Sequence, residues 1–156
     1  MELMFDNPRY IIDASSMITQ KNDELFRRSI YKQLWDNIDA LIRDHIIVTC
    51  SEIVCELKDD IVTEWFKNQD FLVLPICDTV QENVRTVVTS YPKLINFREM
   101  KSSGDAFLIA TAMKYSLTVI TEENPKKENR IPFVCKSQGV PCINILGLCE
   151  NENWHF

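Results

Sequence analysis

The stretch Tyr10-Ile11-Ile12-Asp13-Ala14-Ser15-Ser16 runs from apolar residues directly into an acid and two hydroxyl residues. A short continuous apolar run of this kind is typical of a strand that is buried on both faces of a parallel sheet. We therefore predict a strand over residues 9–13, followed by a turn or helix entry. Asp13 then lies at the carboxyl end of that strand.

Two further apolar runs have acidic residues close behind them. Ile46-Ile47-Val48-Thr49 precedes Glu52 and Glu56, and Thr118-Val119-Ile120-Thr121 runs into Glu122 and Glu123. Carboxylates at the ends of parallel strands gather at one edge of the sheet, where they repel one another unless a positive charge lies between them. The simplest such charge is a divalent metal ion.

Asp105 adds another acidic position. The residues Ser102-Ser103-Gly104-Asp105 carry helix start signals, and the apolar pattern behind them predicts a helix to about Tyr115. Helix N-termini point to the same edge as the strand ends, where ligands bind in open parallel sheets. We therefore expect these acids to face one pocket: Asp13, Glu56, Asp105 and the pair Glu122-Glu123.

Strand and helix patterns alternate along the chain, which predicts an α/β fold with a parallel sheet covered on both faces. The predicted strands are 9–13, 46–49, 71–76, 117–121 and 140–146. The predicted helices are 23–44 with room for one break, a helix from a Thr49-x-x-Glu52 capping box to Ile61, then 79–90, 102–115 and 131–137. A connection containing Pro92, a polar loop over 122–130 and a polar tail over 151–156 complete the chain.

The composition indicates an ordinary globular chain. Its 156 residues are 46% hydrophobic with only three glycines, so we expect a single domain over residues 1–156 without linkers. The first apolar run is too short for a signal peptide or a transmembrane helix, so we expect a cytoplasmic protein with no membrane contact. Six cysteines without a CxxC pair favour buried, reduced thiols over zinc ligands or disulfides.

The net charge of −6 and the pI near 4.9 argue against strong unaided binding to nucleic acid. A metal cluster reverses the sign of the field locally, and a partner protein could supply positive charge. Basic residues near the predicted edge could contact phosphates or serve only solubility. They are Arg9, Lys101, Lys126, Lys127 and Arg130.

Each acid taken alone also fits a structural role. Asp13 could cap a helix, and Asp105 would be favoured in a first helical turn by the helix dipole. The capping box gives Glu52 a structural role, which leaves Glu56 as the better ligand candidate. The pair Glu122-Glu123 fits solvated loop acids as well as ligands. The acids taken together are more informative than any one of them.

Three blocks of the sequence resemble a PIN domain. They are Tyr10 to Ile18, Ile47 to Leu57, and Gly104 to Thr121, and their order and spacing cover most of the chain. The resemblance implies a three-layer α/β/α sandwich with a central, mainly parallel five-stranded sheet. It also implies Mg²⁺- or Mn²⁺-dependent ribonuclease activity, typically as the toxin of a bacterial toxin–antitoxin pair.

On this resemblance, the catalytic and metal-binding acids are Asp13, Glu56, Asp105 and Glu123. Ser15 and Thr121 fall where similar proteins place hydroxyls that orient acids or water. The fourth acid departs from the family pattern, which has Asp or Asn two residues after the threonine, and here Glu122 and Glu123 compete for that place. A longer Glu can still reach a metal directly or through water.

The expected reaction is hydrolysis of an RNA phosphodiester by a metal-activated water, without a side-chain nucleophile. The expected partners are an RNA substrate, a cognate antitoxin and a second copy in a homodimer, and the end Trp154-His155-Phe156 could dock on either protein or on the body of the chain. The alternative is a catalytically inactive PIN-like scaffold that binds RNA or a protein. The acidic pI and the altered fourth acid favour the scaffold, whereas mutually repelling carboxylates at one edge favour the enzyme.

Overall fold

The computed structural model describes residues 8–58, 60–90, 104–127 and 130–156. The strands are β1 (Tyr10–Ile12), β2 (Ile47–Cys50), β3 (Val73–Leu74), β4 (Thr118–Ile120) and β5 (Cys142–Ile143). The helices are α1 (Ala14–Ile18), α2 (Lys32–Arg43), α3 (Ser51–Glu56), α4 (Asp60–Asn68), α5 (Asp78–Ser90), α6 (Gly104–Tyr115), α7 (Ile131–Ser137) and α8 (Ile145–Asn151). The predicted Pro92 connection, Lys101 and the helix start signals at Ser102 and Ser103 lie outside the described residues.

The five strands form one parallel sheet in the order β3-β2-β1-β4-β5. Tyr10 of β1 pairs with Ile47 of β2 on one side and with Thr118 of β4 on the other. The chain builds the sheet outward from β1 to β3 and then returns to add β4 and β5. The carboxyl ends of β1 and β4 therefore form the switch point of the topology, the place where ligands bind in such sheets.

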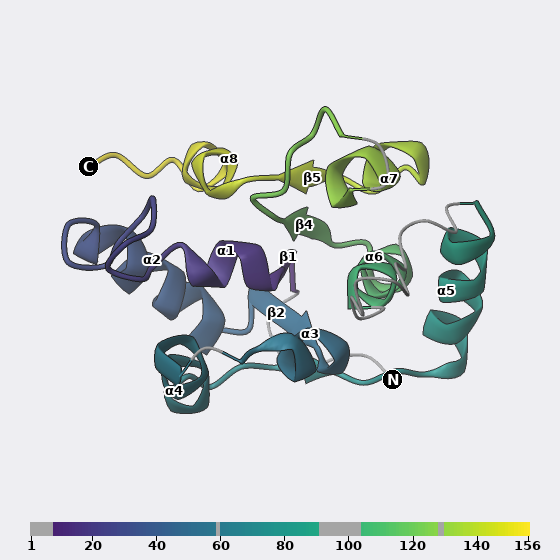
Figure 1. Cartoon of the computed structure of the whole chain (residues 1–156), viewed down its shortest axis with the longest axis horizontal. Helices are drawn as coiled ribbons and strands as arrows, with labels where there is room; N and C mark the ends of the chain where they lie inside the picture. The colour runs from purple at the N-terminus through teal and green to yellow at the C-terminus, as the bar shows by residue number, and fades with distance from the viewer. Residues whose placement is uncertain (1–7, 59, 91–103, 128–129) are drawn as a thin grey trace.

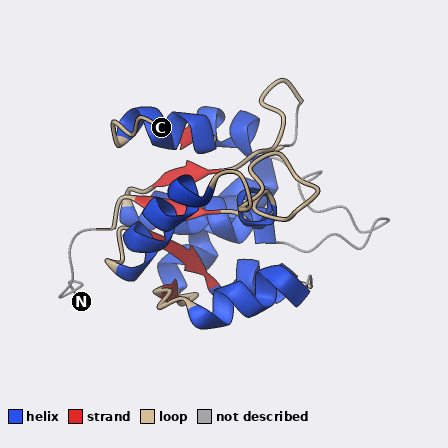
Figure 2. Cartoon of the chain, turned by 90° about the vertical axis from the view of Figure 1, so that its left-hand side faces the viewer, coloured by secondary structure: helices blue, strands red, loops and turns tan. Residues whose placement is uncertain are grey.

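Helices cover both faces of this sheet, as the sequence predicts. In Figure 1, α1 and α2 lie on one side of the column of strands, and α5 and α6 lie on the other. Figure 2 shows the strands inside a shell of helices. This division follows from right-handed crossovers, because the chain changes direction across the sheet after β3.

The core forms where the sheet meets α2 and α6. Ile11, Ile12 and Val119 of the central strands are fully buried, as is Trp35 of α2. Helix α6 packs against α3, α5, β2 and β4, which explains why its sequence is apolar around nearly its whole circumference. This burial fixes the N-terminal end of α6, and with it Asp105, beside the strand ends.

The predicted helix over 23–44 is wrong in its first part, because α2 begins only at Lys32. Leu25 and Ile30 fit the helical spacing, but they are 64% and 69% exposed and face no core. Turns replace the helix in this segment, where Trp35 Nε1 donates to Phe26 O at 2.6 Å. Such contacts with α2 outweigh the local helical pattern.

The capping box at Thr49 is also wrong. Cys50 is the N-cap residue of α3 without a side-chain capping bond, and Thr49 Oγ1 instead donates to Ile12 O at 3.2 Å. The predicted helix to Ile61 is two helices, because Leu57 adopts an extended backbone with ψ of 106° and ends α3. Glu56 is therefore the last residue of a short helix rather than part of a long one.

The last predicted strand, 140–146, is shorter than expected. Strand β5 ends at Ile143, and Asn144 then caps α8 by accepting a hydrogen bond from Gly147 N at 2.8 Å. Helix α8 therefore occupies part of the segment predicted as strand and tail. All six cysteines are free, with Cys50 and Cys135 buried, whereas Cys55 is exposed, contrary to the expectation of burial. Within the described residues, no helix has the length and apolarity needed to cross a membrane.

Candidate metal centre

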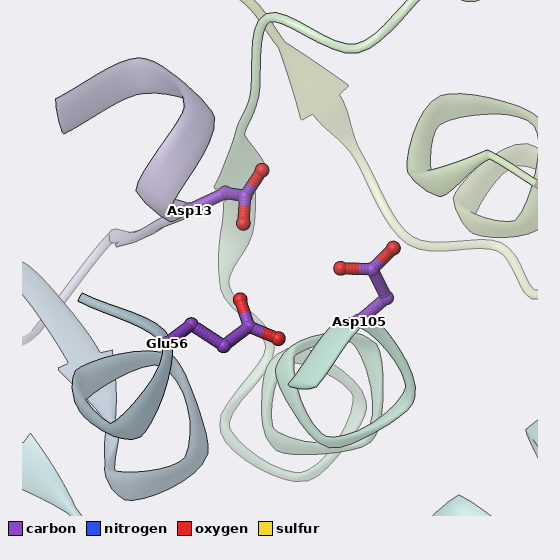
Figure 3. A group of neighbouring side chains, drawn as sticks. All are labelled: Asp13, Glu56 and Asp105. Carbon is purple, nitrogen blue, oxygen red and sulfur yellow. The ribbon is translucent and has the colours of Figure 1, made fainter. Parts of the chain in front are cut away.

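Three carboxylates from distant parts of the sequence meet at the carboxyl edge of the sheet. Asp13 follows β1, Glu56 ends α3, and Asp105 is the second residue of α6. One oxygen from each carboxylate lies within 4.8 Å of the others. Figure 3 shows the three side chains directed toward one another from these separate elements. The structure therefore brings together three of the acids that the sequence marks.

Hydroxyl groups hold the carboxylate of Asp13 in place. Asp13 Oδ2 accepts hydrogen bonds from Ser15 Oγ at 2.7 Å and from Thr121 Oγ1 at 3.0 Å. These hydroxyls in turn accept from the backbone N–H groups of Glu122, at 3.1 Å, and Glu123, at 3.2 Å. Both hydroxyl donors therefore bind the same carboxylate oxygen, Oδ2.

Asp13 is only 3% exposed, although it is an acid in a group of acids. Burial raises the pKa of Asp13, and the hydrogen bonds from Ser15 and Thr121 partly oppose that rise. The backbone N–H groups of Ala14 and Ser15 at the start of α1 oppose the rise as well, but burial outweighs these hydrogen bonds. A buried carboxylate next to two others is costly unless a cation joins them.

Gly104 lets Glu56 approach the start of α6. A Cβ atom at position 104 would lie 2.6 Å from Glu56 Cδ and closer still to Oε1, distances that real Cβ atoms do not reach. The carboxylate of Glu56 therefore occupies the space that any larger residue would fill. In the sequence, Gly104 is only a helix start signal, and no local pattern around it predicts the contact with Glu56.

Glu122 and Glu123 both hold helix starts. Glu122 Oε2 accepts from Ile145 N of α8, and Glu123 Oε1 accepts from Ile131 N of α7, each at 2.9 Å. Burial raises the pKa of Glu122, and the hydrogen bond from Ile145 N–H opposes that rise. Among the described residues, neither acid belongs to the close group of Asp13, Glu56 and Asp105.

Glu123 nevertheless lies in the neighbourhood of the group. A hydrogen bond from Cys135 lowers the pKa of the Cys142 thiol, while burial and the negative charges of Asp13 and Glu123 oppose the shift. Both carboxylates therefore lie near the same sulfur atom.

A domain of unknown function, DUF4411, matches residues 10–156. The chain belongs to the DUF4411 family. Among curated protein sequences, none matches the chain significantly.

Solved structures show the same fold in other proteins. FitAcB from Neisseria gonorrhoeae has a TM-score of 0.53 at 18% identity, over 88% of this chain and 98% of that one. VapBC2 from Rickettsia felis, in a structure bound to a promoter DNA fragment, has a TM-score of 0.53 at 13% identity, over 86% of this chain and 97% of that one. PAE2754 from Pyrobaculum aerophilum has a TM-score of 0.52 at 13% identity, over 93% of this chain and 89% of that one. The DUF4411 chain therefore has a PIN-like α/β fold, as its sequence predicts.

The donor set of this DUF4411 chain fits a hard divalent cation. All three close ligands are carboxylates, which suit Mg²⁺ and Mn²⁺ and do not suit zinc or copper sites built from Cys and His. Two oxygens bound to one Mg²⁺ lie at most about 4.2 Å apart, since each metal–oxygen bond is about 2.1 Å long. The three carboxylate oxygens lie within 4.8 Å of one another, which is close to that span.

Proposed function

We propose that this protein is a Mg²⁺- or Mn²⁺-dependent endoribonuclease. The observation that carries the proposal is the meeting of Asp13, Glu56 and Asp105 at the switch point of a PIN-like sheet, with Asp13 almost fully buried. A structural scaffold has no need to bury a carboxylate beside two others. Hydrolysis of a phosphodiester needs such a group, because negative charge develops on the phosphate oxygens.

In this proposal the water oxygen forms a bond to phosphorus and loses a proton, while the bond from phosphorus to the leaving ribose oxygen breaks and the leaving oxygen gains a proton. A bound ion would lower the pKa of the attacking water and stabilise the charge on the leaving oxygen. Asp13, Glu56 and Asp105 hold the ion, and Ser15 and Thr121 fix the orientation of Asp13. Glu123 is the fourth acid and acts at longer range or through water, whereas Glu122 holds α8.

A protein partner is part of the same proposal. FitAcB and VapBC2 share this fold, and we infer that the chain is the toxin of a toxin–antitoxin pair. Apolar side chains that are more than half exposed would suit an antitoxin or a second copy in a homodimer. They are Leu25, Ile30, Ile61, Leu146 and Phe156. Joint purification with the product of a neighbouring gene, followed by loss of cleavage in the complex, would support this assignment.

The decisive test is a Mn²⁺ titration by calorimetry of the wild type and Asp105→Asn, with the same samples assayed for cleavage of a mixed RNA pool. Asp23→Asn is a matched control, because Asp23 is exposed in the turn segment before α2. We expect Asp105→Asn to lose binding and cleavage together and Asp23→Asn to retain both. Binding without cleavage in the wild type would favour the scaffold, and absence of binding would overturn the metal centre.

A further inference from the structure

Two neighbouring pockets lie on the β4–β5 side of the sheet, and together they are called the groove here. The first, of about 410 Å³, is lined in part by Thr121, whose hydroxyl donates to Asp13 Oδ2 at 3.0 Å. The second has a volume of about 780 Å³. Pro125, Pro132 and Cys142 line both pockets, so the two are direct neighbours. A strand whose phosphate lies at the carboxylates would place its next nucleotide in this groove, and pockets of roughly 300–1,000 Å³ are usual for such ligands.

Two asparagine side chains line the first pocket in fixed orientations. Asn124 Oδ1 accepts from Lys126 N at 2.9 Å, and Asn144 Oδ1 accepts from Gly147 N at 2.8 Å. Because the backbone holds each carbonyl oxygen, each Nδ2 donor is left for other partners, and neither has one among the described residues. Held amide donors suit a ligand with hydrogen-bond acceptors along one edge, which is the chemistry of a nucleobase.

The walls of the groove suit the rest of a nucleotide. The rings of Pro125 and Pro132 provide apolar surface for the faces of a base. In the second pocket, Phe133 is 37% exposed and offers an aromatic ring for stacking. Lys136 lines the same pocket and makes no ion pair within the described parts of the chain, so its ammonium group can bind a phosphate.

The charges along the groove match a strand that leaves the carboxylate group. Glu122 and Glu123 also line the first pocket, but helix N–H groups of α8 and α7 bind their carboxylates. Positive charge lies at Lys136, which lines the second pocket, and at the exposed Lys126 and Lys127, which directly follow Pro125. An acidic chain therefore carries a local basic stretch where the phosphate after the first pocket would lie.

We propose that this groove binds the nucleotide adjoining the cleaved phosphodiester of a single-stranded RNA. Its base lies in the first pocket, where Asn124 and Asn144 donate to its acceptors, and its outer phosphate lies at Lys136. The inference rests on the proposed function, because the carboxylate group fixes where the cleaved phosphate lies. It makes these asparagines determinants of which base flanks the cleavage site.

Asn144→Asp tests the proposal without removing the helix cap, because the new carboxylate still accepts from Gly147 N. It replaces the Nδ2 donor by a negative charge. Asn68→Asp is the matched control, since it adds the same charge to an exposed site on α4, which precedes β3 at the opposite edge of the sheet. Lys136→Ala tests the phosphate contact.

The measurement is fluorescence anisotropy of a fluorescein-labelled, mixed-sequence single-stranded RNA with the full chain in Ca²⁺, together with Mn²⁺ calorimetry on each variant. We expect Asn144→Asp and Lys136→Ala each to weaken RNA binding by about tenfold, with Asn68→Asp at the wild-type level and Mn²⁺ binding unchanged in all three. Equal RNA binding in all variants would overturn the groove and leave the metal-dependent ribonuclease standing. A wild type that binds Mn²⁺ but no RNA would overturn both, as expected if the groove holds a segment of a partner protein.

Discussion

The carboxylate of Glu56 fills the space beside Gly104 where a side chain would otherwise lie. A Cβ atom at position 104 would be 2.6 Å from Glu56 Cδ and 3.1 Å from Oε2. The short helix α3 ends at Glu56, and α6 begins at Gly104, so this contact joins two helix ends at the carboxylate group. Glycine at this position is therefore a condition for the three acids to meet.

Gly104→Ala should displace Glu56 and lower Mn²⁺ affinity by about tenfold or more, a loss of about 1.4 kcal/mol of binding free energy. Glu56→Asp in the same chain should restore part of the affinity, because the shorter acid leaves room for the new methyl group. Calorimetry measures the affinity, and circular dichroism checks the fold. Alanine favours a helix over glycine by about 1 kcal/mol, so a stabilised variant with normal affinity would contradict the close contact.

Thr121→Val should destabilise the protein by about 1–3 kcal/mol, because it leaves the Glu123 N–H group without its acceptor and removes a donor to Asp13. Thr121 is only 2% exposed, so water cannot readily replace the hydroxyl. Urea unfolding measures the change. Thr86→Val is the control, because Thr86 Oγ1 donates to Glu82 O on the exposed face of α5. Loss of that hydrogen bond should change the free energy of unfolding by no more than about 0.5 kcal/mol.

Asp13→Asn should stabilise the metal-free protein at neutral pH. The folded pKa of Asp13 is raised by burial, so the folded state retains the proton more strongly than the unfolded state does. The free energy of unfolding of the wild type therefore falls as the pH rises from the ordinary pKa of an aspartate, 3.8, to the higher pKa of Asp13 in the folded state. Above the folded pKa this loss of stability remains. Urea unfolding in EDTA should show a higher free energy of unfolding for Asp13→Asn than for the wild type at pH 7 and no difference in acid. An equal increase at both pH values would contradict the burial argument.

Glu123→Gln and Glu122→Gln should separate the two candidate acids. Each amide keeps an oxygen that can accept from the backbone N–H of Ile131 or Ile145, so both variants should fold. Only Glu123→Gln should reduce kcat/KM for RNA cleavage, by about tenfold, because Glu123 lies near the carboxylate group. The same loss in Glu122→Gln would assign the fourth acid to the other residue.

The sequence predicts the parallel sheet and the position of Asp13 because both depend on local patterns. Each predicted strand overlaps an observed one, and Ser15 and Thr121 donate hydrogen bonds to Asp13. A buried strand requires a run of apolar residues, and an acid directly after it can lie only at the sheet edge. The strands and the position of Asp13 can therefore be predicted without knowledge of contacts between distant residues.

The features that sequence reasoning missed depend on contacts between distant residues. Residues 23–31 have helical spacing but form turns, because Arg28 binds Gln20 and Asp39 and fixes the segment against α2. The contact of Glu56 with Gly104 likewise joins α3 to α6, which is distant in the sequence. No local pattern around position 56 or position 104 contains that information.

On the proposed function, the arrangement of the three acids would also make the rate at which the chain is degraded depend on the supply of metal. Asp13, Glu56 and Asp105 come from separate segments, so only the folded chain offers the site. An ion at one hundred times its dissociation constant then adds about 2.7 kcal/mol to folding stability. Proteases attack chains that open, so on the proposed function a cell short of Mg²⁺ or Mn²⁺ would clear this protein faster as well as leave it inactive.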